Sequence, residues 1–187
     1  DDWIVRPDFR LSLGLRYEWQ NNIHFWKDLA PRLSFAWAPG DPKTRKTAVR
    51  FGFGIFYDRF SEKLTLQAVR LNGLNQQQYQ VRNPDFFPTV SPFQAFGDQL
   101  PVTIRRVASD LRAPYITQAS IGIERLLPLK TTVASTVTIS RGLNLLRSRN
   151  INAPLPGTFV PGDVTSGIRP YGPGNIFEYE SSGSLKQ

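Results

Sequence analysis

Strict alternation of apolar and polar side chains marks residues 9–19. Every odd position in this segment is a large apolar residue, and every even position is polar, charged or glycine. This period of two is typical of a β-strand with one apolar face and one polar face. The segment is longer than the usual strand of about 5–6 residues, and it matches the roughly 9–11 residues with which a tilted strand crosses a bilayer. Its last residues include Tyr17 and Trp19, of the type found at membrane–water interfaces.

The same pattern, or a run of β-branched residues, recurs along the chain. It predicts further strands at residues 3–5, 32–38, 49–58, 103–107, 115–124 and 131–147. The strand at 49–58 carries aromatic side chains on its apolar face. The sequence therefore predicts an all-β, antiparallel fold of about six or seven strands.

The connections between these strands alternate between short and long. The short turns are at residues 6–8, 39–46 and 127–130, and the longer loops are at 20–30, 59–113 and 148–187. All short turns therefore fall at one end of the strands and all long loops at the other. Outer-membrane β-barrels show this asymmetry, with short periplasmic turns and long extracellular loops, whereas a compact soluble domain seldom carries an irregular segment as long as 59–113.

A soluble β-sandwich or a lipocalin-like barrel would also show alternation. The large aromatic content of the apolar faces and the length of the loops favour a membrane barrel over these soluble folds. We therefore predict a segment of a larger antiparallel transmembrane β-barrel with long extracellular loops, located in the bacterial outer membrane.

The composition argues against several other classes of protein. The chain has 187 residues, no cysteine and one histidine, so disulfide, zinc-ribbon and thiol chemistry are ruled out and a histidine-based metal site has little support. No unbroken apolar stretch of about 18 residues is present, which excludes a transmembrane helix. The net charge is +8, but lysine and arginine are spread along the chain, so we expect no nucleic-acid partner.

No constellation of residues points to catalysis. His24 lies near Asp28 without a serine nucleophile in a strand–turn–helix setting. The glycines of residues 52–54 lie inside an alternating strand and lack the Gly-Lys-Ser/Thr of a phosphate loop. Asp58 and Glu62 lie at a strand end with no catalytic context. We expect no enzyme activity, no catalytic residue, no cofactor and no metal site.

Several segments resemble motifs of TonB-dependent outer-membrane receptors. They are residues 14–18, 31–37, 50–59, 111–118, 140–152, 169–171 and 176–183. The segment 50–59 resembles the R-x-G-x-G-x-F-Y-D strand of large receptors that carry an N-terminal carboxypeptidase-regulatory-like domain, the Oar-like type. The resemblance covers almost the whole chain, and its specificity comes from the collinear order of the motifs.

The resemblance implies active uptake of a large or scarce nutrient, driven by TonB acting on a plug domain. We find no plug domain in the sequence, so residues 1–187 are expected to form part of a receptor barrel, with extracellular loops at 59–113 and 148–187. The implied partners are outer-membrane lipid, the TonB complex through a plug outside this chain, and an unknown extracellular ligand. A passive structural or adhesive outer-membrane barrel and a soluble β-rich binding module remain the alternatives.

Two sets of residues are candidates for the site. The first set is charged and is expected to face the lumen, where we favour solvation or contact with the plug over substrate binding: Arg10, Arg16, Glu18, Arg50 and Asp58. The second set is aromatic and lies in the long loops: Tyr79, Phe86, Phe87, Tyr171 and Tyr179. Loop aromatics could stack on a sugar or peptide ligand, although such residues more often pack a loop against itself.

Overall fold

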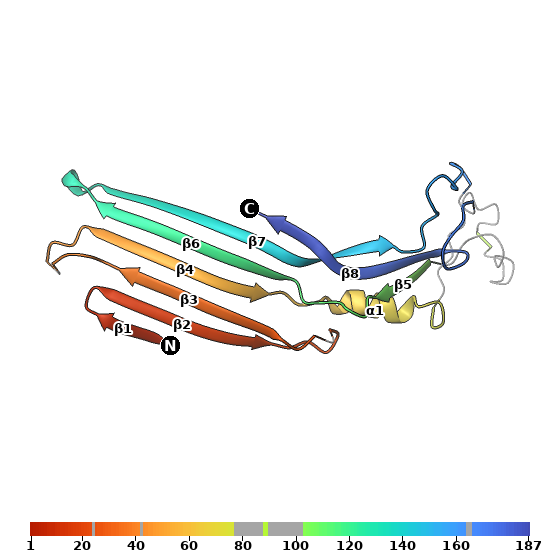
Figure 1. The fold of residues 1–187 in the computed structure, drawn as a ribbon, viewed down its shortest axis with the longest axis horizontal. Coiled ribbons are helices and arrows are strands. Elements are labelled where there is room, and N and C mark those ends of the chain that lie inside the picture. Colours follow the sequence, from red (N-terminus) through yellow and green to blue (C-terminus); the bar gives the residue numbers. More distant parts are fainter. Residues whose placement is uncertain (24, 42, 77–87, 90–102, 164–165) are drawn as a thin grey trace. The chain divides into compact units, whose positions relative to one another are not determined.

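The computed structural model (Figure 1) describes residues 1–23, 25–41, 43–76, 88–89, 103–163 and 166–187. The strands are β1 (Asp2–Arg6), β2 (Phe9–Glu18), β3 (Asp28–Trp37), β4 (Thr47–Tyr57), β5 (Thr103–Val107), β6 (Tyr115–Leu126), β7 (Thr132–Asn150) and β8 (Asn175–Lys186). The helices are α1 (Glu62–Arg70) and the short 3₁₀ helix η2 (Pro128–Lys130). Neither of these helices has the length and apolar character that a membrane-spanning helix requires.

The chain forms two compact units. Unit 1 comprises Asp1–Arg59, Arg112–Leu146 and Ser181–Gln187, and unit 2 comprises Phe60–Leu111 and Arg147–Glu180. Strands β7 and β8 each contribute residues to both units.

Unit 1 is a single antiparallel sheet in the order β1-β2-β3-β4-β6-β7, with the end of β8 beside β7. Pairing is long and regular, as between β2 and β3, which are in register from Phe9 and Trp37 to Glu18 and Asp28. The end of β8 is attached where Ser140 and Gln187 exchange backbone hydrogen bonds of 3.0 and 2.9 Å. Figure 1 shows these strands side by side in one layer. The predicted antiparallel all-β fold is confirmed.

Strand β3 begins earlier than the sequence pattern predicts. Residues 20–30 were expected to form a loop, but β3 starts at Asp28 and runs through Pro31, which pairs with Leu15. Proline has no backbone N–H and is rare inside a sheet, so it conceals the start of this strand in the sequence.

Unit 2 contains regular structure in both segments that were expected to be long loops. Strand β5 lies in residues 59–113 as predicted, but α1 in the same segment was not predicted. Residues 148–187 contain β8, which pairs in parallel with β5 from Thr103 and Asn175 to Val107 and Tyr179. The expectation of a loop throughout residues 148–187 was therefore wrong.

Helix α1 is short and fits between a polar start and a glycine turn. Glu62 lies in its first turn and Arg70 in its last, an arrangement that complements the helix dipole. After the helix the chain reverses at Gly73, whose φ is +86°, and a Cβ at that position would lie 3.1 Å from Ile104 Cδ1. With two turns, the helix is too short for a clear period of 3.6 in the sequence.

Candidate functional site

Successive cross-strand rows of the unit 1 sheet alternate between apolar and polar side chains. One row crosses the strands as Leu13, Leu33, Phe53, Ala119 and Ile139. The next row along the strands crosses as Ser12, Ser34, Gly52, Ser120 and Thr138. Because partners in antiparallel strands share a face, the sheet has one apolar face and one polar face, as the alternation in the sequence predicts.

The apolar face is continuous and uncovered within the described residues. The rings of Phe9 and Phe35 stack with centroids 5.8 Å apart, and those of Phe35 and Phe51 with centroids 5.4 Å apart. Further from these rings, Leu15 and Ile139 are 71% and 59% exposed. An apolar sheet face of this extent needs an apolar layer against it, and the described part of unit 1 supplies none.

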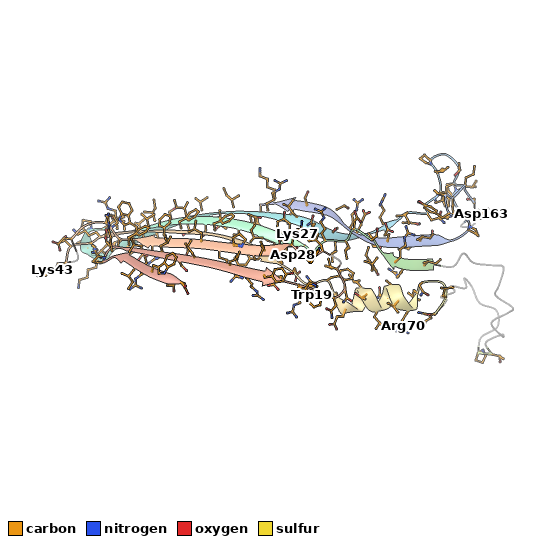
Figure 2. The ribbon with its side chains drawn as sticks, turned by 60° about the horizontal axis from the view of Figure 1, so that its bottom comes forward. Trp19, Lys27, Asp28, Lys43, Arg70 and Asp163 are labelled. Carbon is orange, nitrogen blue, oxygen red and sulfur yellow. The ribbon has the colours of Figure 1, made fainter. Side chains whose placement is uncertain are left out.

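Aromatic side chains border the apolar face at both ends of the strands. At the end where the long loops begin, the rings of Tyr57 and Tyr115 lie 5.3 Å apart, and Tyr17 Oη donates to the carbonyl of Trp26 at 2.9 Å. At the end with the short turns, Trp37 pairs with Phe9. Figure 2 places Trp19 and Asp28 toward the first end and Lys43 in the turn at the second.

The distance between these borders agrees with a membrane. The eight residue steps from Phe9 to Tyr17 span about 26 Å along an extended strand, or about 20 Å along the membrane normal at the usual tilt. The apolar band of outer-membrane barrels, about 25 Å tall and flanked by aromatic girdles, has similar dimensions.

The polar face carries small residues and charged side chains that pair with one another. Arg16 Nε lies 2.5 Å from Glu18 Oε1, and Arg50 NH1 lies 2.9 Å from Glu124 Oε2. The guanidinium of Arg32 lies over the ring of Phe56, 4.9 Å from its centroid. This face therefore presents a nearly balanced set of charges on a surface of serine, glycine and alanine.

The structure divides the charged candidates into two groups on this face. Arg10 and Arg50 flank Ala36 in one cross-strand row and line a cavity of about 490 Å³. Arg16, Glu18 and Asp58 line a different cavity of about 360 Å³ at the loop end. Their shared face was predicted correctly, and its position against a barrel lumen stays a prediction.

Asp58 differs from the other charged candidates because it lies just beyond β4. Its backbone N–H donates to the Pro114 carbonyl at 2.8 Å, and its carbonyl accepts from Gln20 Nε2 at 3.1 Å. Its carboxylate accepts a hydrogen bond of 2.8 Å from the backbone N–H of Arg59. Asp58 therefore ends the strand and fixes the start of the following segment.

Sequence reasoning missed three charged residues on the polar face. Arg32 and Glu124 lie at even positions of their strands and could have been found by the alternation that identified Arg10 and Arg50. Asp28, which is 3% exposed and lies opposite Glu18, was assigned to a loop because Pro31 conceals the start of β3.

The aromatic loop candidates have different environments in unit 2. Tyr171 is 64% exposed and available to a ligand, whereas Tyr179 is 5% exposed. Tyr179 Oη donates to Gln67 Oε1 at 2.8 Å and accepts from Arg105 NH1 at 3.0 Å, so it packs unit 2 together and is wrongly placed as a ligand-stacking residue. Tyr79, Phe86 and Phe87 lie outside the described residues.

A buried asparagine that the sequence did not single out holds the loop between β7 and β8. Asn152 is fully buried, and its Nδ2 donates to the carbonyls of Gly172 and Gly174 at 2.8 and 2.9 Å. Its Oδ1 accepts from the backbone N–H of Tyr171 at 2.8 Å, and its carbonyl accepts from Arg169 NH1 at 2.7 Å. These bonds fix the base from which Tyr171 projects.

Comparison with known proteins identifies a family and a fold. A family model described as an outer membrane beta barrel domain matches residues 21–186. The structure is similar to that of the siderophore receptor PirA from Pseudomonas aeruginosa, with a TM-score of 0.53 and 14% identity over 99% of this chain and 28% of that one. It is also similar to a mutant of the ferric enterobactin receptor PfeA from Pseudomonas aeruginosa, with a TM-score of 0.53 and 15% identity over 99% of this chain and 22% of that one. No curated protein matches the chain.

These matches bear on the fold predictions directly. The family match and the two solved receptors confirm the expected outer-membrane β-barrel segment, and with it the expected location in the bacterial outer membrane. The chain spans about a quarter of the length of each of these receptors.

Proposed function

Because the chain belongs to the outer membrane β-barrel domain family, we propose that it forms barrel wall and extracellular loops of a TonB-dependent receptor that takes up a large or scarce nutrient. The observation that carries this proposal is the sheet of unit 1. It has an uncovered apolar face with aromatic borders and a polar face of small residues and paired charges.

The two faces have different tasks in this proposal. The apolar face contacts lipid, where an arginine at the midplane would cost about 2–4 kcal/mol. The polar face lines the lumen, where Arg10, Arg16 and Arg50 stay hydrated or meet the plug. The pairing of Arg50 with Glu124 leaves little net charge at that point, which suits a wall that packs against a plug better than one that captures a charged ligand.

Energy coupling and ligand capture involve other parts of the protein. TonB would act through a plug encoded outside this chain, and a ligand would meet the loops of unit 2, where Tyr171 is exposed. The printed titles of the two similar structures name a siderophore receptor and a ferric enterobactin receptor; they support an uptake role here without assigning the nutrient. We propose no catalytic role for the chain.

The receptor proposal is tested with the full parent protein in two steps. The envelope is fractionated, and unheated and heated samples of the outer-membrane fraction are compared on a gel; a barrel is expected to migrate differently after heating. A soluble protein without a heat shift would contradict the barrel and leave the soluble β-rich module as the better account.

The second step separates an active receptor from a passive barrel. The purified parent protein is mixed with the periplasmic domain of TonB from the same organism, and binding is measured by co-purification. We expect binding that is lost when the parent's N-terminal region up to the first strand is deleted. A heat-modifiable barrel that never binds TonB would favour the structural or adhesive alternative.

A further inference from the structure

Unit 2 contains a cavity that no part of the proposal above uses. It has a volume of about 520 Å³ and lies between α1, β5 and the start of β8. Most of its lining is aliphatic, including Ala68, Val69, Ile104, Val107 and Ile176. Pockets that hold small molecules have volumes of about 300–1,000 Å³, with apolar walls and a few placed polar groups.

One polar atom in this wall lacks a partner. Thr65 lines the cavity, and its Oγ1 is buried without a hydrogen-bond partner among the described residues. Buried hydroxyl groups are nearly always hydrogen-bonded in folded proteins. The unpaired oxygen therefore marks a position where a bound molecule would complete the wall.

Both arginines of the cavity wall are already neutralised or occupied. Arg106 Nε lies 2.5 Å from Glu178 Oε2. Arg105 NH1 donates to Tyr179 Oη at 3.0 Å, and its guanidinium lies 5.7 Å from the centroid of the Phe177 ring. Their charged ends are thus engaged elsewhere, so an anionic ligand would have to break existing contacts to reach them.

We propose that this cavity binds a neutral, largely apolar group of the transported ligand, oriented by one hydrogen bond to Thr65 Oγ1. The inference rests on the proposed uptake function, because it makes unit 2 a ligand-binding part of the receptor. It names the chemical class of the ligand: an uncharged aliphatic or aromatic group that bears a hydroxyl or carbonyl oxygen.

The proposal is tested by thiol modification, because the chain contains no cysteine. Thr65→Cys and Ala68→Cys are introduced separately into the parent receptor, with any cysteines elsewhere in it replaced by serine. Modification rates are measured with a neutral benzyl methanethiosulfonate, an anionic sulfonatoethyl reagent and a cationic trimethylammonium reagent, each normalised to a free thiol. At both positions we expect the neutral reagent to react faster than either charged one by about tenfold or more, because a charge is costly to bury.

The matched control is Leu66→Cys, which lies in the same helix but is exposed. The three normalised rates should be similar there. Similar rates for all reagents at Thr65→Cys and Ala68→Cys, or no reaction at either while Leu66→Cys reacts, would overturn the proposal.

The role of the hydroxyl is tested with benzyl alcohol as the probe. Benzyl alcohol should protect Ala68→Cys from the benzyl reagent, and the protection should fall when Thr65→Val is added but persist with Thr65→Ser. Equal protection in both double variants would contradict the hydrogen bond. A heat-shift gel on the same samples tests the barrel separately, so a failure of the receptor proposal is distinguishable from a failure of the cavity.

Discussion

Val137 and Thr138 are neighbours in β7, but their side chains project from opposite faces of the unit 1 sheet. Val137 pairs with Ile121 on the apolar face, and Thr138 pairs with Ser120 on the polar face. At the scale of single residues, the row in which a side chain lies therefore decides how a charge at that position is tolerated.

This contrast gives a direct prediction for a pair of variants. Val137→Arg should destabilise the inserted barrel by about 2–4 kcal/mol because it places a charge against lipid, whereas Thr138→Arg should be close to neutral. The free energy of unfolding of the parent protein is measured in urea with lipid vesicles. Equal destabilisation by the two variants would contradict the assignment of the faces.

Asn152 supports a second prediction at this scale. Its replacement by alanine leaves the carbonyls of Gly172 and Gly174 and the N–H of Tyr171 without their buried partner, at a cost of about 1–3 kcal/mol. We expect Asn152→Ala to make residues 151–174 sensitive to protease while the heat shift of the barrel is retained. Asn21→Ala, at an exposed position, is the control and should change neither property. Unchanged protease resistance of Asn152→Ala would show that the loop is held by other contacts.

Among the elements of unit 1, the end of β8 is attached to β7 by a close approach of backbones. A Cβ at Gly183 would lie 2.9 Å from both the carbonyl oxygen and the Cβ of Leu145. Only a residue without a side chain fits there, so this glycine sets how closely the two strands pack.

The corresponding prediction compares two glycines in strands. Gly183→Ala should destabilise the barrel by about 1–3 kcal/mol, because the strands must separate to admit the methyl group. Gly14→Ala should be tolerated, because its nearest neighbour would be Arg32 Cβ at an ordinary 3.6 Å. The temperature at which the heat-modified band appears is the readout, and a larger fall for Gly14→Ala would refute the account.

The elements also show how far the sequence pattern reaches. β2, β4 and β6 have uninterrupted alternation and were predicted close to their observed positions. β8 was missed because serine and glycine occupy both faces of its second half, which removes the period of two. The pairing of β5 with β8 joins segments about 70 residues apart, and no local pattern specifies such a partner.

The same physical limit applies to the site. The shared face of Arg10, Arg16, Glu18 and Arg50 follows from parity alone, so the sequence predicts it. The burial of Tyr179 and the loop-holding role of Asn152 depend on contacts with Gln67 and Gly174 from other segments. In the sequence, Asn152 looks like an ordinary turn residue beside proline and glycine.

For the molecule as a whole, the account depends on a sheet one layer thick with lipid on one side and an aqueous lumen on the other. Unit 1 meets this condition by the alternation of its rows, from Leu13 and Ser12 in β2 to Ile139 and Thr138 in β7. A soluble sandwich would need a second layer over the apolar face, and the described residues of unit 1 contain none.

The most direct test is a spin-label scan along β7 of the parent protein in lipid vesicles. Single cysteines at positions 133–140 are labelled, and the accessibility of each label to oxygen and to a water-soluble nickel chelate is measured. We expect a period of two, with the labels at Val133, Val137 and Ile139 accessible to oxygen and those at Thr136 and Thr138 accessible to the chelate. Equal access of the chelate to both sets would contradict a lipid-facing wall and with it the central claim.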